Sequence, residues 1–537
     1  MGTLLYGGNI YTLQEEGHKV EALYFEESSI LDYGEKSSLE KKYQTSIEDT
    51  INLQGDTLLP GFVDSHMHLI GYGEKLLRLD LSECTSKEEA LLKVADLAEK
   101  ISEGEWIIGD GWNENLWKEK SPLSRQELDA YVPNHPVLLS RICKHAIAVN
   151  SKALQLSGIQ ENASAPFGGV IERDANGMLN GILKDQAQEL VKKHLPKVTD
   201  EYVENALRTA IKDCYQLGLT GVHTEDLYYY HGYEGTLRAF KKVVEDESYF
   251  FRTHLLVHHE VFSEMVQGGG KYLSGSEWVE LGAMKIFADG AFGGRTALLS
   301  RPYQDDPTTN GVSIFTQEEL NHLVKSAREK EIPVAVHAIG DAAFEMVLNA
   351  IEEHPLQGFG RDRLIHATML RKDLLERVKK LPIILDIQPC FVTSDFPWII
   401  DRLGEDNMKY CYAWKTLIKE GLHCAGGSDA PIETANPLVG IQAAVTRTNK
   451  FDTSGKGYRM EEALSLYEAV CLYTKESAYA ICRETERGMI KENYTADFTV
   501  LDQDIFKINK KNIETVKVTK TIIGGQVVYD SDFISEN

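Results

Sequence analysis

The segment Leu58-Leu59-Pro60-Gly61-Phe62-Val63-Asp64-Ser65-His66-Met67-His68-Leu69 decides how the rest of the chain is interpreted. A short apolar run bounded by Pro and Gly is typical of a buried strand. Because side chains of a strand alternate between its faces, His66 and His68 share one face, one pleat apart. Two imidazoles at the end of a rigid strand can bind one divalent metal ion. The alternative is a strand edge with two solvated histidines, and this motif alone leaves both interpretations open.

The size and composition of the chain exclude several classes of protein. Its 537 residues exceed the ~250–300 at which a single core usually stops growing, so we expect more than one domain. The net charge of −25 disfavours binding to nucleic acid or to an anionic membrane. No stretch approaches the ~18 apolar residues of a membrane helix, and the first residues lack the pattern of a signal peptide. The eight cysteines are scattered, which favours reduced thiols in a cytoplasmic protein.

Most of the chain alternates between helical patterns and single apolar strands. Capping-box patterns at Ser86 to Glu89 and at Thr316 to Glu319 predict two helix starts. Such alternation predicts a parallel sheet. Its repetition over some 400 residues, with polar residues at the strand ends, favours a (β/α)₈ barrel, whose active site lies at those ends. An open doubly wound sheet is disfavoured because no Gly-x-Gly-x-x-Gly follows an early strand.

The two ends of the chain differ from this middle part. Residues 1–57 and 487–537 contain short apolar runs separated by turns, which predicts that both ends meet in one small β domain. The barrel is then expected over residues 58–486. Residues from about 106 to 195 contain three tryptophans and little periodicity, so we predict an irregular insertion on the barrel. If it follows the strand-end loops, the insertion forms the wall of a substrate site.

Six residues that can bind a metal lie at the predicted strand ends. Four histidines, one lysine and one aspartate provide the nitrogen and oxygen ligands of zinc or a similar metal. They are His66, His68, Lys285, His337, His366 and Asp429. Each alone could be structural, but their joint placement favours a metal centre. Lys285 could instead extend its ammonium to the barrel rim, and an ammonium would be repelled by a metal ion unless its charge is removed.

These residues carry a resemblance to the amidohydrolase superfamily. The run from Pro60 to His68 is similar to the first-strand signature of that superfamily. Further segments resemble its YtcJ-like branch, which includes N-substituted formamide deformylases. They are Asp110-Gly111-Trp112-Asn113, His145 to Leu154, Met284 to Gly290, Val336 to Asp341, Ile365-His366-Ala367 and Gly427 to Pro431.

The resemblance implies both a fold and a cofactor. The implied fold is a (β/α)₈ barrel with a composite β-sandwich built from both termini. The implied cofactor is one or two divalent ions, with zinc as the first choice. His66 and His68 would hold one ion, and His337 and His366 the other. Lys285 would be carbamylated, which turns its ammonium into an anion that bridges the two ions.

Other residues are candidates for substrate binding. His145 resembles the family position that approaches the substrate from the insertion, although a core or surface histidine fits the sequence as well. Arg295, just past Asp289, could hold an oxyanion or a carboxylate, or could form a salt bridge within its loop. His223 ends a predicted strand and could line the site. Trp112 could wall an apolar pocket, but a buried tryptophan often only packs.

Asp429 is the candidate for proton transfer. It follows the last predicted strand and two glycines, which let the backbone approach the centre closely. Its carboxylate could bind a metal through one oxygen and accept a proton from water through the other. The alternative is that Asp429 caps the helix after Pro431.

The function that these residues predict is metal-dependent hydrolysis of a non-peptide C–N bond, such as an N-acyl or N-formyl amide, by a metal-activated hydroxide. The substrate is expected to be a small molecule, and a homodimer is left open. One alternative is deamination of a heterocyclic C=N bond. Deaminases of this superfamily resemble each other in a Glu soon after the fifth-strand histidine, and the residues after His337 lack it. A non-catalytic scaffold barrel is the other alternative, although such relatives usually lose ligands.

Overall fold

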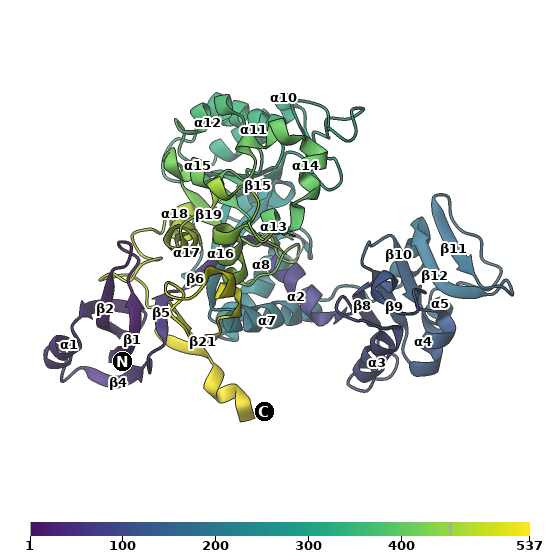
Figure 1. The fold of residues 1–537 in the computed structure, drawn as a ribbon, viewed down its shortest axis with the longest axis horizontal. Coiled ribbons are helices and arrows are strands. Elements are labelled where there is room, and N and C mark those ends of the chain that lie inside the picture. Colours follow the sequence, from purple (N-terminus) through teal and green to yellow (C-terminus); the bar gives the residue numbers. More distant parts are fainter. Residues whose placement is uncertain (1, 450–451, 453, 537) are drawn as a thin grey trace. The chain divides into compact units, whose positions relative to one another are not determined.

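The structure, a computed structural model, describes residues 2–449, 452 and 454–536. The chain divides into two compact units. The barrel unit comprises Met1–Tyr72 and Val203–Asn537, and the insertion unit comprises Gly73–Tyr202. Figure 1 shows both units, with many of their helices and strands labelled.

The barrel unit is built on an eight-stranded parallel sheet. The strand order is β19-β18-β17-β16-β15-β14-β13-β6, so consecutive strands along the chain are neighbours in space. The strands are β6 (Phe62–Met67), β13 (Leu219–Thr224), β14 (Arg252–His258), β15 (Val279–Phe287), β16 (Val334–Ala338), β17 (Asp362–His366), β18 (Ile383–Ile387) and β19 (Cys424–Gly426).

Backbone hydrogen bonds just after β6 and β19 bring the first and last strands of this sheet together. The Asp429 N–H donates to the His66 carbonyl at 2.7 Å, and the His68 N–H donates to the Ala430 carbonyl at 2.8 Å. A Cβ on Gly427 would lie 2.6 Å from the backbone nitrogen of His66, so the close approach requires glycine there. The near-closed parallel sheet confirms the predicted TIM-like barrel.

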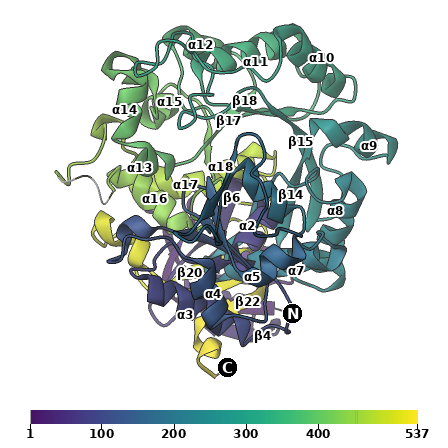
Figure 2. The ribbon, with the colours of Figure 1, turned by 90° about the vertical axis from the view of Figure 1, so that its right-hand side faces the viewer.

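Helices cover the outside of the sheet. Around β15, β17 and β18, Figure 2 shows helices from α9 (Phe262–Gln267) to α15 (Trp414–Lys419). Between α9 and α15, the helices in chain order are α10 (Gln317–Arg328), α11 (Asp341–Glu353), α12 (Lys372–Val378), α13 (Phe391–Asp395) and α14 (Trp398–Leu403). The predicted start of α10 is confirmed, because Thr316 and Glu319 form a capping box. No helix of the described ranges is both long and apolar enough to span a membrane.

Strands from both ends of the chain share one further sheet. Its order is β22-β21-β20-β5-β1-β2-β3, and β4 pairs with β1. The strands are β1 (Gly2–Tyr11), β2 (Lys19–Glu26), β3 (Ser29–Gly34), β4 (Ile47–Asn52), β5 (Thr57–Pro60), β20 (Phe498–Leu501), β21 (Val518–Ile523) and β22 (Gln526–Asp530). A β-sandwich domain bounded at residues 57 and 487 stays a prediction.

A buried ion pair ties this terminal sheet to the barrel. The guanidinium of Arg252, at the start of β14, donates to both carboxylate oxygens of Asp497 at 2.5 and 3.0 Å. Asp497 directly precedes β20 and also accepts the N–H of Gly524. The pair therefore holds the terminal sheet, next to β20, against the N-terminal end of β14.

The insertion unit has a sheet of its own, with the order β11-β12-β10-β9-β8-β7. The strands are β7 (Leu79–Asp80), β8 (Ile107–Trp112), β9 (Val137–Arg141), β10 (Ala146–Val149), β11 (Gly169–Arg173) and β12 (Leu179–Asp185). The unit starts at Gly73, earlier than the predicted 106–195. The difference arises because helix α3 (Lys87–Ala98) buries Leu91 and Val94 in the same apolar core as Trp112.

Candidate metal centre

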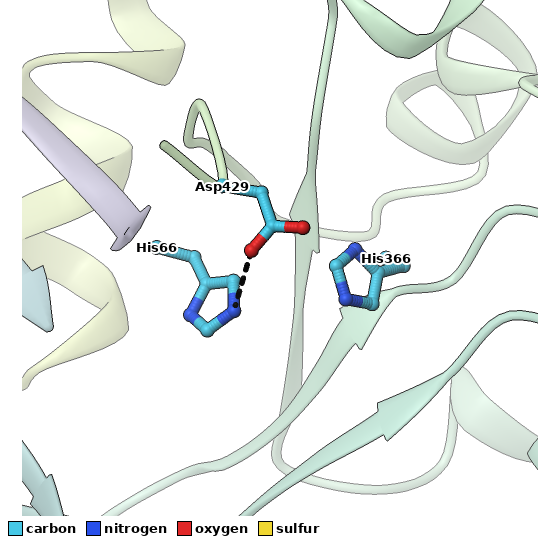
Figure 3. A group of neighbouring side chains, drawn as sticks. All are labelled: His66, His366 and Asp429. Atoms are coloured by element: carbon cyan, nitrogen blue, oxygen red, sulfur yellow. Dashed lines mark ion pairs between the residues drawn. The ribbon is translucent and has the colours of Figure 1, made fainter. Parts of the chain in front are cut away.

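Three of the six strand-end residues form a compact group of metal-binding atoms. His66, His366 and Asp429 are buried, and each offers one ligand atom within 4.8 Å of the other two. The carboxylate of Asp429 lies between the two imidazoles in Figure 3, with Oδ1 3.5 Å from His66 Nε2. The residues come from the ends of β6, β17 and β19, as expected for a barrel site.

His68 and Lys285 adjoin this group. His68 Nε2 also lies 3.5 Å from Asp429 Oδ1, so one carboxylate oxygen faces both histidines of the His-x-His motif. Lys285 is fully buried in β15, and its Nζ lies 3.3 Å from His66 Nε2. Five of the six residues selected from the sequence thus meet around His66 and Asp429.

His337 lies beside His366 but is held differently. The two ring centroids are 4.4 Å apart. His337 Nε2 lies 3.0 Å from the carbonyl oxygen of Gly290, which accepts its proton if that nitrogen is protonated. The other ring nitrogen of His337 then keeps its lone pair for a metal ion.

The structure adds three orienting residues that the sequence analysis did not select. Asp64 accepts the backbone N–H groups of His66 and Ser428, and so joins β6 to the loop after β19. Gln388 Oε1 lies 2.7 Å from His366 Nδ1. Glu225, at the end of β13, places its backbone carbonyl 2.9 Å and its carboxylate 3.6 Å from His68 Nδ1. Gln388 and Glu225 both follow predicted strands, and that position was the available signal.

Two site residues have backbone conformations that ordinary residues rarely adopt. His366 has φ = 75° and Asp429 has φ = 58°. Such left-handed conformations outside glycine store strain and persist where the surrounding structure holds them. Their coincidence on two of the three grouped residues indicates a functional site.

Burial and mutual charge set the protonation of the site. Burial lowers the pKa of His66 well below its usual value, that of His366 to about 4, and that of Lys285 to about 8. Burial alone would raise the pKa of Asp429, but the hydrogen bond with His68 and nearby positive charges lower it. Neutral imidazoles and an ionised carboxylate are the forms that bind a metal ion. His68 differs, because burial lowers its pKa but the hydrogen bond and charge of Asp429 raise it to about 9, so His68 must lose a proton before it can bind a metal ion.

Comparison with known proteins identifies the family. The amidohydrolase family pattern matches residues 49–529. The chain belongs to the amidohydrolase family. It is 52% identical over 530 residues to "Putative amidohydrolase YtcJ" of Bacillus subtilis (strain 168), covering 99% of this chain and 100% of that protein. The recognised YtcJ-like branch is thereby confirmed.

Two further relatives bear on this amidohydrolase. The N-substituted formamide deformylase of Arthrobacter pascens is 26% identical over 505 residues, covering 90% of each protein. A crystal structure of an uncharacterized metal-dependent hydrolase from Pyrococcus horikoshii OT3 superposes with a TM-score of 0.77 at 30% identity. That match covers 95% of this chain and 99% of the other. The family match and the metal-dependent hydrolase relative support a metal-dependent hydrolase.

His223 lies elsewhere in the amidohydrolase barrel. It belongs to a second buried group, the lower polar cluster, which comprises His223, His254, Glu280, Arg363 and Asp386. The His223 and His254 ring centroids are 5.2 Å apart. The strand β13 ends one residue beyond His223, at Thr224, and the next residue, Glu225, lies beside His68. A role of His223 in lining the site stays a prediction.

Asp289 contacts the segment after β16 as well as its own loop, and its Oδ1 lies 3.5 Å from His337 Nε2, whereas Arg295 pairs within its own loop. The buried carboxylate of Asp289 accepts the backbone N–H groups of Leu298, Ile339 and Gly340. The guanidinium of Arg295 is one-third exposed and pairs with Asp305 at 2.9 Å. These contacts favour the salt-bridge alternative for Arg295, and a substrate role for either residue stays a prediction.

The two candidates of the insertion unit differ from each other. Trp112 is 1% exposed and donates its indole N–H to the Leu139 carbonyl, so its packing accounts for it and does not support a pocket wall. His145 is exposed, and its Nδ1 lies 3.0 Å from Asp185. A substrate contact of His145 stays a prediction.

The alternative role of Asp429 as a helix cap is wrong. The next helix, α16 (Pro437–Thr446), begins eight positions later, and Asn436 caps it by accepting the Leu438 N–H. Asp429 instead directs its side chain toward the histidines, as Figure 3 shows.

Proposed function

We propose that this amidohydrolase hydrolyses a C–N bond outside peptides in a small molecule, with an N-acyl or N-formyl amide as the substrate class. The grouping of His66, His366 and Asp429 beside Lys285 carries the proposal, because it supplies metal ligands and a proton acceptor in one place. The likeness to an N-substituted formamide deformylase supports the choice of bond. Free thiols at all eight cysteines support a cytoplasmic location.

The residues present fit a divalent metal ion. Two imidazole nitrogens and one carboxylate oxygen, mutually within 4.8 Å, are ligand types that zinc takes. His366 has an acceptor, Gln388, at its other ring nitrogen, which is the usual outer contact of a metal-binding histidine. We assign His66, His366 and Asp429 to the ion, with His68 as a further ligand on Asp429's side.

A second ion would require Lys285 to lose its positive charge. Its ammonium lies 3.3 Å from His66 Nε2, close enough to repel a metal ion bound there. Carbamylation of Nζ would convert this group into an anion. With two ions bound, His66, His68 and Asp429 would keep the first ion, and His366 would instead join His337 and the carbamylated Lys285 in holding the second.

The proposed chemistry divides between the ion and Asp429. When bound, the ion supplies Lewis-acid chemistry, which makes water more acidic and polarises a carbonyl. Asp429 accepts a proton at a carboxylate oxygen when water attacks, and returns it to the departing nitrogen. An amine is a poor leaving group unless it is protonated, so this transfer is the step for which the site needs a positioned base.

The test is hydrolysis by protein stripped of metal with a chelator and then reloaded with zinc. Reloaded protein should release amine from a panel of N-formyl and N-acetyl amides, and stripped protein should not. His322→Asn, on the exposed face of α10, is the control that should behave as the parent. Hydrolysis of esters with no release of amine from any amide would contradict the proposed bond class.

Lys285 has its own test within this scheme. Lys285→Ala should bind less metal, and bicarbonate with a short carboxylic acid should restore part of the metal and the activity. Full metal content and normal turnover in Lys285→Ala would contradict the carbamate assignment.

A further inference from the structure

A small cleft lies among the loops that follow the barrel strands β15, β17 and β18. Its volume is about 230 Å³, and it is lined by parts of the segments 299–302, 369–372 and 406–410, together with Asp341 at the start of α11. The backbone N–H of Leu370 donates to the Tyr410 carbonyl at 3.2 Å, which joins two of these segments. The cleft is therefore formed at the same end of the barrel as the candidate metal centre, but by other residues.

Three exposed cations line this cleft, which we call the basic cleft after Arg301, Lys372 and Lys409. Within the parts of the chain that the structure describes, none of the three forms an ion pair with a carboxylate. Arg301 donates to the side-chain oxygen of Asn407 at 3.5 Å, and Lys409 Nζ lies 5.4 Å from the centroid of the Tyr410 ring. The chain has 82 acidic against 57 basic residues, so basic side chains are expected to lie near carboxylates. Three neighbouring cations without one are an exception.

A fourth cation of the cleft, Arg371, is already compensated. Its Nη1 donates to Asp341 Oδ2 at 3.1 Å, and the backbone N–H of Ser300 donates to Asp341 Oδ1 at 2.9 Å. Asp341 is fully buried, so its charge is satisfied beneath the surface of the cleft. The other lining carboxylate among the described residues is Asp406. Against the three exposed cations, Asp406 leaves an excess of two positive charges.

We propose that the basic cleft binds the phosphate group of a small molecule. A cleft lined by one sign of charge concentrates ions of the opposite sign. A phosphate monoester carries about −1.5 to −2 charges at pH 7, which matches the excess of two, whereas a carboxylate carries a single charge. Guanidinium and ammonium groups are common partners of phosphate oxygens. The volume is below the ~300–1,000 Å³ of sites for drug-sized ligands, which suits a small charged group.

The experiment measures binding to the metal-loaded full chain, so it does not depend on the proposed amide hydrolysis. Inorganic phosphate is titrated at constant ionic strength and followed by ³¹P NMR relaxation, and acetate is titrated in parallel by ¹H NMR. Phosphate should bind more tightly than acetate. Arg301→Gln and Lys409→Gln each remove one exposed charge, and each should raise the Kd for phosphate by about 1.4-fold to fivefold. The double variant should raise it by about twofold to 25-fold if the two effects multiply.

A matched control separates the cleft from the net charge of the protein. Lys325 is exposed on α10 and does not line the cleft, so Lys325→Gln removes the same charge elsewhere and should keep the parent Kd. A Kd that the double variant leaves unchanged would overturn the inference, because phosphate would then bind at the metal ion or at another place. Equal weakening by Lys325→Gln, or acetate bound as tightly as phosphate, would also overturn it.

A turnover arm, which does rest on the proposed amide hydrolysis, distinguishes two sources of the phosphate group. Phosphate that raises KM for an N-formyl amide in the parent, but not in the double variant, would show that the cleft holds a phosphate of the substrate. Phosphate that changes kcat in the parent alone would show that the cleft holds a separate effector. If no amide is hydrolysed, the proposed function fails while the binding arm still decides the inference.

Discussion

The barrel contains two buried polar groups that share a composition but differ in arrangement. In the lower polar cluster, charged groups pair with each other: Arg363 donates to Asp386 at 2.8 Å, and His254 Nδ1 lies 3.1 Å from Glu280. At the strand ends, His66, His68 and His366 instead face one carboxylate and share it. Burial of charge is costly unless it is compensated. In the lower cluster the charges are only partly paired, since Arg363 Nη1 and Asp386 Oδ1 have no hydrogen-bond partner among the described residues, whereas at the strand ends the ligand atoms converge on one carboxylate.

This difference shows which properties distinguish a buried structural group of polar residues from a functional site. Both groups are buried and both have shifted pKa values, so neither property distinguishes them. Convergence on a common point, together with strained backbone at His366 and Asp429, does distinguish them. The comparison predicts that changes in the lower cluster affect stability, and that changes at the strand ends affect metal binding and turnover.

The largest effect is expected for Asp429→Asn. Asparagine keeps the shape but cannot hold the proton, so kcat should fall by about 10²–10⁴. Steady-state kinetics measures this loss, and circular dichroism with elemental analysis should show a folded protein that retains metal. Turnover within a few-fold of the parent would remove Asp429 from the mechanism.

A change in the lower polar cluster should act on stability instead. Arg363→Met leaves the carboxylate of Asp386 buried without its partner, which should lower the free energy of unfolding by about 3–5 kcal/mol. Urea denaturation measures the change. The double variant Arg363→Met with Asp386→Leu removes both charges and should recover most of the loss. If the double variant is no more stable than the single one, the pair is not self-compensating.

An intermediate effect is expected at Gln388, which orients His366. Loss of such an outer contact typically weakens metal affinity by about 10–100-fold. Gln388→Leu should show this loss in a competition titration with a chromogenic chelator, while Gln388→Glu keeps an acceptor at His366 Nδ1 and should lose less. Equal affinity in parent and Gln388→Leu would show that His366 needs no such support.

The smallest effect lies in the insertion unit. Ser124 and Glu127 form a capping box at the start of α4 (Arg125–Tyr131). Ser124→Ala should lower stability by about 1 kcal/mol, with metal content unchanged. A loss of metal in Ser124→Ala would mean that the insertion unit governs the centre as well as its own folding.

The sequence predicted the barrel and the strand-end residues because both follow from local rules. Alternation of helix and strand predicts a parallel sheet, and His66 lies near the end of β6 and Asp429 shortly after β19. The sequence did not predict that Trp112 packs in the core of a separate unit. This packing depends on contacts with Leu91 and Val94 of helix α3, which lie far from Trp112 in any local pattern. Glu225 and Gln388 were passed over for the same reason, since their importance lies in the histidines that they face.

The most direct test of the metal centre is the stoichiometry of zinc binding to the chain freed of metal. Isothermal titration should give at least one tightly bound ion per parent chain and per His322→Asn chain. His366→Asn should lose that tight binding while keeping the parent's circular dichroism spectrum. Zinc bound to His366→Asn with the parent's stoichiometry and affinity would contradict the assignment of the centre to His66, His366 and Asp429.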